Sequence, residues 1–348
     1  MRSLTINARY KNRPVTGVER FATEVANELR GRDLVSREID PGRQLAGIKG
    51  HAWEQFVLPA KMFPGKNEIL LSPCNTGPVA VKNQFVVIHD AAVWDYPEGF
   101  SRSFGTLYRN LLPALAKRCC RVGTVSEFSR SRLAEYLKLP ENEIVVLGNA
   151  TSSAFRPAVT RRSEHPPRFF CVCSLDPRKN FTKLISAWQA LQKAGSLPEG
   201  TTLRIAGGAN PRNFSSVTLE ESDTVKWLGR ISDGELIREY QQATAFIFPS
   251  LYEGFGLPPL EAMACGCPVL LSRCASLPEV GGTEFDRKNE GAVLYFDPSD
   301  TDSISAAINN FLSLNGQEID ALSANAVKRS GKFSWSAVTD KIVQSLED

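Results

Sequence analysis

Two glutamates bracket a run of glycines and prolines in the segment EGFGLPPLE, which follows a short apolar run. Glu253 and Glu261 are separated by seven residues. An ionised carboxylate accepts hydrogen bonds from neighbouring hydroxyls, such as those of a ribose or a sugar, but it does not bind a phosphate. Gly254 and Gly256 let the backbone approach a ligand closely. The segment therefore indicates a site for a ligand that carries hydroxyl groups.

Pro258 and Pro259 predict the start of a helix, because proline fits the first helical turn and not the helix interior. Glu261 is then expected in that first turn. The free amide groups at this end of a helix favour an anion such as a phosphate. A lone glutamate there could serve only as a partner of the helix dipole. The neighbouring glycines and Glu253 argue for a ligand instead.

A pair of cations stands in the segment CVCSLDPRKNF. Arg178 and Lys179 follow a predicted strand at 169–173 and precede a predicted helix at 180–194. Residues of the turn and cap types surround the pair: Asp176, Pro177 and Asn180. Taken alone, such a pair on a loop is a solvated charge. Considered together with the two glutamates elsewhere in the sequence, it would supply the positive groups that a phosphate needs.

His89 follows the apolar run QFVVI, at the expected carboxyl end of a strand. A titratable group at such a place faces a crevice, although a histidine bonded only within its loop is the alternative. The segment 102–121 carries an apolar stripe flanked by arginines and lysines. It predicts either a core-facing helix or a surface for an anionic membrane or lipid phosphate.

The elements that position these residues follow from the pattern of the whole chain. Short apolar runs alternate with helical patterns, which predicts an α/β protein with parallel sheets covered by helices. Ligands on such sheets bind beyond the carboxyl ends of the strands. A proline-rich and charged stretch at 155–168 predicts an interdomain linker. The last residues predict a terminal amphipathic helix.

Length and composition restrict the class of protein. The 348 residues suit about two domains, and 42% apolar with 23% charged residues is ordinary for a globular protein. Residues 1–155 contain 21 Lys and Arg against 15 Asp and Glu, which favours an anionic partner. Because no long charge run or interleaved aromatics occur, we do not expect nucleic acid.

Several kinds of site are missing from the sequence. It contains no G-x-G-x-x-G and no G-x4-G-K-S/T, so we expect neither a nicotinamide enzyme nor a P-loop ATPase. The cysteine spacings do not match zinc sites, and the acids at 300–302 suit a helix cap, so we expect no metal. No apolar stretch has the length of a signal peptide or of a membrane span, about 18 residues, which predicts a cytoplasmic protein.

Seven motifs in order carry a resemblance to a known family. They are TGVERFATEV at 16–25, VIHDAAVWDYPEGF at 87–100, VSEFSRSRLAEYL at 125–137, SLDPRKNFTKLI at 174–185, LRIAGG at 203–208, VKWLGRISDGEL at 225–236 and FPSLYEGFGLPPLEAMACGCPV at 248–269. With this set the chain resembles the retaining glycosyltransferases of the GT-B fold, the large "group 1" set numbered family 4, and especially its bacterial mannosyltransferase-like members. The resemblance covers nearly all of the chain.

The resemblance implies two Rossmann-like domains with parallel sheets facing across a cleft. Residues 1–157 would form the N-terminal, acceptor-binding domain. Residues 158–332 would form the C-terminal domain, which binds the nucleotide sugar. Residues 333–348 would form a C-terminal helix that crosses back to the N-terminal domain.

The resemblance also implies roles for individual residues. The implied catalytic residues are His89, Arg178, Lys179 and Glu253. The implied donor-binding residues are Gly17, Arg178, Lys179, Gly229, Arg230, Ile231, Glu253, Gly254, Phe255, Gly256, Leu257 and Glu261. Glu261 would take the ribose hydroxyls, Glu253 would lie near the donor sugar, and the two cations would hold the diphosphate. His89 would face the sugar, and Gly17 would let its loop approach the diphosphate.

The family keeps the anomeric configuration, for which a front-face reaction is the usual proposal: the leaving phosphate helps to deprotonate the acceptor. No metal or other cofactor is needed if Arg178 and Lys179 neutralise the diphosphate. One departure is Cys173-Ser174, where relatives commonly have a glycine. A side chain at 173 would restrict the approach of the backbone to the phosphate.

The expected partners are a nucleotide-diphosphate sugar and a saccharide acceptor, lipid-linked by family habit, in surface polysaccharide synthesis. The motifs favour GDP-mannose and leave a UDP- or dTDP-sugar open. The basic first half and the segment 102–121 suggest peripheral contact with the anionic inner face of the cell membrane. Two other hypotheses stay open: a nucleotide-sugar epimerase on the same fold, and a non-catalytic relative that binds nucleotide sugars.

Overall fold

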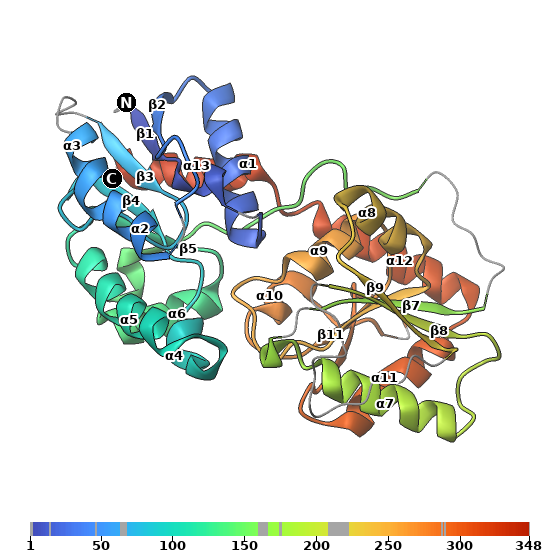
Figure 1. Ribbon diagram of the computed structural model, residues 1–348. Coiled ribbons are helices and arrows are strands. Elements are labelled where there is room, and N and C mark those ends of the chain that lie inside the picture. Colours follow the sequence, from blue (N-terminus) through green and yellow to red (C-terminus); the bar gives the residue numbers. More distant parts are fainter. Residues whose placement is uncertain are drawn as a thin grey trace. The chain divides into compact units, whose positions relative to one another are not determined.

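The chain folds into two compact units in the computed structural model (Figure 1). Unit 1 comprises Met1–Ala150 together with Phe333–Asp348, and unit 2 comprises Thr151–Lys332. The structure describes residues 3–13, 15–45, 47–62, 68–158, 166–173, 176–207, 223–286, 288 and 290–347. Ser174, which belongs to the departure noted above, lies outside the described residues.

Unit 1 is built on a six-stranded parallel sheet of order β2-β1-β3-β4-β5-β6. Its strands are β1 (Leu4–Asn7), β2 (Val35–Ile39), β3 (Ile69–Ser72), β4 (Gln84–Val87), β5 (Arg121–Thr124) and β6 (Ile144–Val146). The strands are short and mostly apolar, which suits a sheet that is covered on both faces. Ile6, Leu70 and Phe85 are fully buried in it.

Helices cover both faces of this sheet. They are α1 (Gly17–Gly31), α2 (Gly47–Ala52), the π-helix η2 (Trp53–Val57), α3 (Leu58–Met62), α4 (Ala92–Asp95), α5 (Arg102–Ala116), α6 (Glu127–Leu137) and α13 (Trp335–Glu347), with short 3-10 turns η1 (Arg9–Asn12), η3 (Pro97–Gly99) and η4 (Glu141–Glu143). The terminal helix α13 packs on α1, with Trp335 edge-on against Phe21 at 5.7 Å between ring centroids. The far ends of the sequence are therefore neighbours in unit 1.

The basic segment 102–121 is a helix over only part of its length. Helix α5 ends at Ala116, and Arg121 already begins strand β5, because the sheet recruits the apolar run that follows. Tyr108, Leu112 and Leu115 of α5 are buried in the core. The core-facing alternative is therefore the one that the fold adopts.

Unit 2 repeats the plan with a six-stranded parallel sheet of order β12-β11-β10-β7-β8-β9. Its strands are β7 (Arg168–Val172), β8 (Thr202–Ala206), β9 (Val225–Gly229), β10 (Ala245–Phe248), β11 (Val269–Ser272) and β12 (Leu294–Phe296). Its helices are η5 (Pro177–Lys179), α7 (Phe181–Lys193), α8 (Asp233–Gln242), α9 (Leu257–Ala264), α10 (Leu277–Gly281), α11 (Thr301–Leu312) and α12 (Gly316–Ser330).

Helices α7 and α11 pack together on one face of the unit 2 sheet, and α9 packs against α12 on the other (Figure 1). The first face buries Trp188 and Phe311 against Phe169. Asp300 caps α11 by accepting a hydrogen bond from the Asp302 amide at 2.9 Å, so the acids at 300–302 form the predicted cap.

No helix within the described part of the chain is both long enough and apolar enough to cross a membrane.

Candidate active site

The strand order of unit 2 reverses between β7 and β10. The chain leaves β7 for β8 and β9 on one side and then returns to β10 on the other side. The loops that follow these two neighbouring strands therefore diverge at their carboxyl ends, where ligands of such sheets bind. Lys179 lies on the loop after β7, and Glu253 lies on the loop after β10.

Lys179 and Glu253 form an ion pair between the loops that follow β7 and β10. The Nζ to Oε1 distance is 2.6 Å, and both side chains are largely but not fully buried. Ser250 donates to the same carboxylate oxygen at 2.7 Å. The lysine ammonium also lies 5.7 Å from the centroid of the Phe248 ring. The arrangement places a cation and a carboxylate side by side, so one ligand could meet both.

Arg178 is held by its own loop. Its guanidinium pairs with Asp176, and the Asp176 carboxylate also accepts from the Arg178 amide at 3.0 Å. Burial opposes the charge of Asp176, but the bonds and charge of Arg178 outweigh it and lower the pKa of that carboxyl. The Leu251 amide donates to the Arg178 carbonyl at 2.7 Å, which ties the two loops together. Both predicted cations thus have carboxylate partners that a phosphate would have to replace or share.

Asn180 fastens the cation loop. Its φ of 54° is left-handed, a conformation that asparagine tolerates better than most residues. The sequence suggested that the Asn180 side chain caps α7, but this side chain makes no capping hydrogen bond. The amide instead donates to the carbonyls of Pro249, at 3.1 Å, and Pro298, at 2.7 Å, and the side chain is buried. These two hydrogen bonds form in place of the cap. They hold the loop of Lys179 beside β10.

The glycine turn before α9 requires glycine at 256. Gly256 has φ of 109° and precedes the helix, and a Cβ there would come within 2.7 Å of a Leu277 methyl group. The helix begins at Leu257, earlier than the proline pair alone indicates, so Glu261 is its fifth residue and not part of the first turn. The prediction of a first-turn Glu261 is wrong, because Gly256 already turns the chain into the helix.

Glu261 is buried, with 6% of its surface exposed, and it accepts a hydrogen bond from the Tyr240 hydroxyl at 3.2 Å. Tyr240 of α8 is itself fully buried and packs edge-on against Phe170 and Phe246. The phenol of Tyr240, on α8, therefore orients the carboxylate of Glu261, on α9. Phe255, in the turn between the two glutamates, is also buried.

Ser276 holds the loop that carries Glu253 and Phe255. Its hydroxyl lies 2.9 Å from the carbonyl oxygens of both Glu253 and Phe255. Ser250, Ser276 and Tyr240 are the functional residues that sequence reasoning missed. A serine in a loop and a tyrosine in a helix carry no local signal of what they will contact, so only the tertiary structure identifies them.

The predicted base-binding turn lies two strands away from β7, at the carboxyl end of β9. Gly229 has φ of 66° and open space where a side chain would be. Arg230 is exposed and Ile231 is half-buried. The Cys173 side chain packs into the core of unit 2. A Cβ at Gly207 would lie 1.5 Å from the Cys173 carbonyl oxygen, so the close approach of two backbones occurs at Gly207.

Two of the predicted residues, His89 and Gly17, belong to unit 1. His89 follows β4, is 6% exposed, and places its Nε2 2.9 Å from the Pro73 carbonyl oxygen. A carbonyl can only accept, so Nε2 carries the proton and Nδ1 is the acceptor nitrogen of the neutral ring. Burial lowers the pKa of His89, while the Pro73 carbonyl and Asp90 act in the other direction. The neutral ring is therefore favoured at neutral pH.

Gly17 is the first residue of α1 and is exposed. The preceding Thr16 and the following Glu19 form a capping box, with the Thr16 amide 3.2 Å from the Glu19 carboxylate. Unit 2 thus brings Arg178, Lys179 and Glu253 together, whereas His89 and Gly17 lie in unit 1. Among the described residues, no three His, Cys, Asp or Glu side chains are grouped as a metal site would require.

Comparison with known proteins connects this geometry to an enzyme class. The family described as "Glycosyl transferases group 1" matches residues 153–329, more than half of the chain and nearly the whole of unit 2. O-antigen chain mannosyltransferase B of Escherichia coli is 29% identical over 287 residues, which cover 78% of this chain and 71% of that protein. O-antigen chain mannosyltransferase RfbU of Salmonella typhimurium is 30% identical over 257 residues, which cover 72% of this chain and 66% of that protein.

Solved structures show the fold. HepE of Anabaena, in complex with UDP and glucose, superimposes with a TM-score of 0.70 at 15% identity and covers all of both chains. Together with the two parallel sheets, this likeness confirms the predicted α/β GT-B fold. The chain belongs to the glycosyl transferases group 1 family and is a glycosyltransferase.

Proposed function

We propose that the chain is a retaining mannosyltransferase that moves mannose from GDP-mannose to a saccharide acceptor, carried on a lipid, in surface polysaccharide synthesis. Two relatives, 29% and 30% identical to this chain, are O-antigen mannosyltransferases. Their names support mannose as the sugar and surface polysaccharide synthesis as the class of pathway. The Anabaena relative holds UDP and glucose, which supports a nucleotide and a sugar as ligands.

The observation that carries the proposal is the Lys179–Glu253 pair beyond the carboxyl ends of the neighbouring strands β7 and β10. A nucleotide sugar offers phosphate oxygens beside sugar hydroxyls, and these groups match a cation beside a carboxylate. In this proposal Lys179 and Arg178 bind the diphosphate. Glu253 accepts hydrogen bonds from the sugar hydroxyls, and Glu261 accepts hydrogen bonds from the ribose hydroxyls. Gly17 admits the diphosphate, and His89 accepts a sugar hydroxyl through Nδ1.

The reaction breaks the bond between the anomeric carbon and the diphosphate oxygen and forms a bond from that carbon to an acceptor hydroxyl oxygen. The proton of the acceptor hydroxyl passes to the departing phosphate oxygen, so the charges balance. Negative charge develops on the diphosphate as the bond breaks, and preorganised cations stabilise it most effectively. Arg178 and Lys179 therefore act on the rate as well as on binding.

We propose that these cations suffice and that no metal or cofactor takes part. Activity should then persist after EDTA treatment of the purified protein. A loss that Mg²⁺ or Mn²⁺ restores would overturn this part of the proposal. Lys179→Ala should lower kcat about 100-fold or more, while Lys193→Ala, which removes an exposed lysine at the end of α7, should leave it unchanged.

A thermal-shift panel with GDP, UDP, dTDP and ADP tests the donor base. A ligand at 100 times its dissociation constant stabilises the folded state by about 2.7 kcal/mol. We expect GDP to raise Tm, and we expect the rise to disappear in Glu261→Ala. A rise with UDP or dTDP alone would replace GDP-mannose by another donor. No rise with any of the four would contradict a nucleotide-sugar site.

Incubation with radiolabelled GDP-mannose distinguishes a transferase from its two rivals, an epimerase and a non-catalytic nucleotide-sugar-binding protein. An epimerase would convert the donor sugar without an acceptor, and a non-catalytic relative would leave the donor intact under all conditions. A transferase passes the label to an added acceptor. Label in a saccharide product, and none in an epimerised donor, is the expected result.

Membrane contact is proposed for the helical segment 47–62 of unit 1. It exposes three large apolar side chains: Ile48 at 81%, Phe56 at 79% and Val57 at 41%. Lys49 and Lys61 lie on the same segment, so an anionic lipid surface would meet both apolar and cationic groups. Vesicles containing phosphatidylglycerol should retain the protein, and Ile48→Ser with Phe56→Ser should release it. The control Val15→Ser removes another exposed apolar side chain, one outside this segment.

A further inference from the structure

Unit 1 contains a pocket of about 350 Å³ where the second half of α1 meets the start of α13. The residues that line it are Glu24, Asn27, Glu28, Gly31, Arg32 and Trp335. Ligand pockets range from roughly 300 to 1000 Å³, so this one suits a small molecule. None of the site residues predicted from the sequence lines it.

Helix α1 supplies two carboxylates to the pocket wall. Glu24 and Glu28 are four residues apart, so they lie one helical turn from each other on the same face. Glu24 is half-buried and has no hydrogen-bond or ion-pair partner among the residues that the structure describes. Glu28 accepts from Arg32 at 3.0 and 3.2 Å, both times through Oε1. A ligand in the pocket can therefore meet one unpaired carboxylate and the second oxygen of another.

Arg32 is the cation of the lining, and groups of the protein already bind it. Its guanidinium donates to Glu28, to Asp340 of α13 at 2.5 Å and to the Ser336 hydroxyl at 2.7 Å. These bonds hold the guanidinium between the two helices. Arg32 therefore shapes the pocket and has little charge left to attract an anionic ligand.

The balance of charge at the pocket is negative. Glu24, Glu28 and Asp340 carry three negative charges against the single positive charge of Arg32. Arg30, a neighbouring cation on α1, pairs with Glu38 at 3.1 Å and does not offset this excess. The carboxyl end of α1 adds the negative end of the helix dipole. The pocket thus favours a cation and disfavours a phosphate or a carboxylate.

Trp335 places an aromatic ring beside these carboxylates. Its ring lies edge-on to Phe21 at 5.7 Å between centroids, and Phe21 in turn lies edge-on to His89 at 4.8 Å. Phe21 is fully buried, so the indole is anchored to the core of unit 1. Tryptophan is the aromatic side chain that attracts cations most strongly, and this attraction increases when the cation is partly removed from water.

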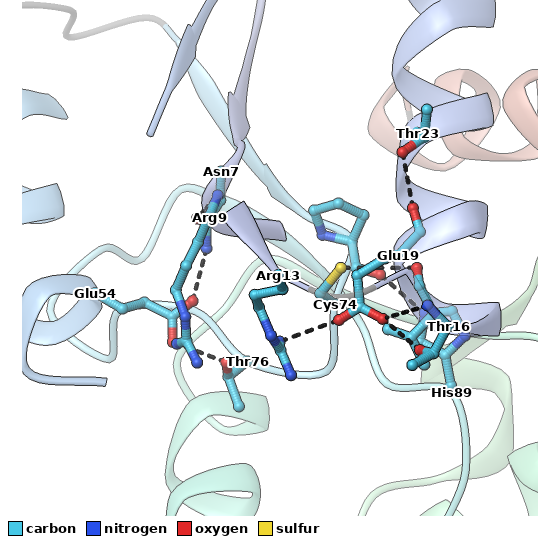
Figure 2. Close-up of polar contacts among 12 residues, drawn as sticks. Asn7, Arg9, Arg13, Thr16, Glu19, Thr23, Glu54, Cys74, Thr76 and His89 are labelled. Atoms are coloured by element: carbon cyan, nitrogen blue, oxygen red, sulfur yellow. Dashed lines mark hydrogen bonds and ion pairs between the residues drawn. The ribbon is translucent and has the colours of Figure 1, made fainter. Parts of the chain in front are cut away.

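The backbone that carries the two carboxylates is held at both ends of α1. At its start the Thr23 hydroxyl donates to the Glu19 carbonyl at 2.9 Å (Figure 2). At its end the Arg32 amide donates to the Leu29 carbonyl at 3.3 Å. Binding to groups that are already in place costs less ordering of the protein.

The lining distinguishes an organic cation from a metal ion. Ca²⁺ takes six to eight oxygen ligands, and Mg²⁺ requires near-ideal octahedral geometry. The pocket offers two carboxylates, one of them shared with Arg32, and an indole that cannot ligate a metal. An alkyl ammonium ion matches all three groups, because its N–H groups donate to carboxylates and its methylene groups pack on an aromatic ring.

We propose that the pocket between α1 and α13 binds a small organic cation, an aliphatic amine in its ammonium form. The ammonium donates to Glu24 and to the free oxygen of Glu28, and the carbon chain lies against Trp335. The charge and the lining of the pocket support this ligand whatever sugar the enzyme transfers.

Calorimetry of the full chain with four probes tests the proposal. Putrescine offers primary ammonium groups, choline offers a quaternary ammonium, 1,4-butanediol is the uncharged analogue of putrescine, and Mg²⁺ is the inorganic cation. We expect putrescine or choline to bind with a stoichiometry of one, and 1,4-butanediol to give no binding at the same millimolar concentration. Absence of binding by both amines, equal binding of the diol, or tighter binding of Mg²⁺ would each overturn the proposal.

Glu24→Gln is the diagnostic variant, because it keeps the side-chain volume and removes the unpaired charge. It should weaken the amine about tenfold, as expected for the loss of one hydrogen bond to a charged group. Glu98→Gln is the matched control: it changes the net charge equally, at an exposed position of unit 1 that does not line the pocket. It should bind the amine like wild type. Equal losses in the two variants would mean that only the overall charge attracts the amine.

Gly31→Leu tests the position of the site. Gly31 ends α1, and nothing lies within 4 Å of the position of its missing Cβ. Leucine there should fill the pocket and abolish amine binding without a loss of stability in urea unfolding. The control Gly316→Leu places the same side chain in open space on unit 2 and should not affect binding. Amine affinity unchanged in Gly31→Leu would show that the amine binds elsewhere, and if Gly31→Leu does not fold, Glu24→Gln still decides.

Discussion

The hydrogen bond from Tyr240 to Glu261 has a consequence for nucleotide binding. If Glu261 holds the ribose as proposed, Tyr240→Phe leaves its carboxylate without the donor that orients it. A hydrogen bond of this kind contributes about 1 kcal/mol, so the affinity for GDP should fall about fivefold. The affinity for 2′-deoxy-GDP should fall less than that for GDP, because this nucleotide lacks one of the ribose hydroxyls that donate a hydrogen bond to Glu261. Calorimetric titration of both nucleotides measures the difference.

Tyr295→Phe provides the matched control. Tyr295 also lies in unit 2 and its hydroxyl donates to the Gly282 carbonyl at 2.9 Å, away from Glu261. This variant should bind both nucleotides like wild type. Equal losses for GDP and 2′-deoxy-GDP in Tyr240→Phe would show that Tyr240 acts on the fold and not on the ribose site.

His89 predicts a pH dependence of stability. Burial holds its pKa below the ordinary value of about 6.5. Just below pH 6.5 the unfolded chain therefore binds a proton that the folded chain does not. The stability that His89 contributes is complete above about pH 6.5 and decreases as the pH falls below it.

Urea unfolding from pH 5 to pH 7.5 tests this sign. The difference in unfolding free energy between wild type and His89→Gln should be constant above pH 6.5 and should shift against wild type at lower pH. A difference that does not change with pH would show that the imidazole titrates alike in both states. The imidazole NMR signal of His89 should also titrate below pH 6.5.

At the scale of residues, the sequence predicted the groups that follow strands and missed those that support them. Lys179 and Glu253 could be identified because each follows an apolar run, and parallel strands bring such positions to one edge. Tyr240 could not, because it lies in a helix and its partner Glu261 comes from another helix. Pairing between distant segments leaves no local pattern.

The proposed donor site depends on the turn into α9. Gly256→Ala would place a side chain at φ of 109° and within 2.7 Å of Leu277. Such backbone strain costs on the order of 1 to 3 kcal/mol, so urea unfolding should show a loss of that size, and GDP affinity should fall because Glu253 and Glu261 flank the turn.

Gly316→Ala is the control for this prediction. Gly316 begins α12, and nothing lies within 4 Å of the position of its missing Cβ. Alanine there should leave stability unchanged or raise it by up to about 1 kcal/mol. If Gly256→Ala were as stable as wild type and bound GDP normally, the left-handed turn would not be required.

At the scale of elements, the strongly apolar strands were predictable and the weak ones were not. The strands β4, β7 and β10 each follow from an apolar run. The edge strand β2 alternates polar side chains and is only partly buried, so it gave no signal. The short strand β3 and the segment 47–62 were also missed, and with β3 the reversal of strand order in unit 1. A π-helix has no sequence period by which it could be predicted.

At the scale of the whole molecule, the two units place their polar groups by the same rule. Each sheet reverses its strand order once, between β1 and β3 in unit 1 and between β7 and β10 in unit 2. Each reversal carries a buried or half-buried ion pair, Arg9–Glu54 in one and Lys179–Glu253 in the other. The topology thus places one charged pair at the corresponding point of each sheet.

The chain crosses from unit 2 back to unit 1 at α13, and this connection predicts how the protein responds to truncation. Val338 and Ile342 of α13 are buried in unit 1, and Arg121 of β5 donates to the Ser345 carbonyl at 2.8 Å. Removal of residues 333–348 would expose this surface, so unit 1 should unfold at a lower temperature. Unit 2 contains none of the removed residues and has its own core, so it should keep its GDP-dependent stabilisation.

Calorimetry of the truncated chain with and without GDP measures both effects. The expected result is an early transition that GDP does not move and a later one that GDP raises. The variant Ile342→Ser, which leaves the chain at full length, should lower the first transition in the same direction. A single transition that shifts as a whole would mean that the two units unfold together, and that α13 stabilises the entire molecule and not unit 1 alone.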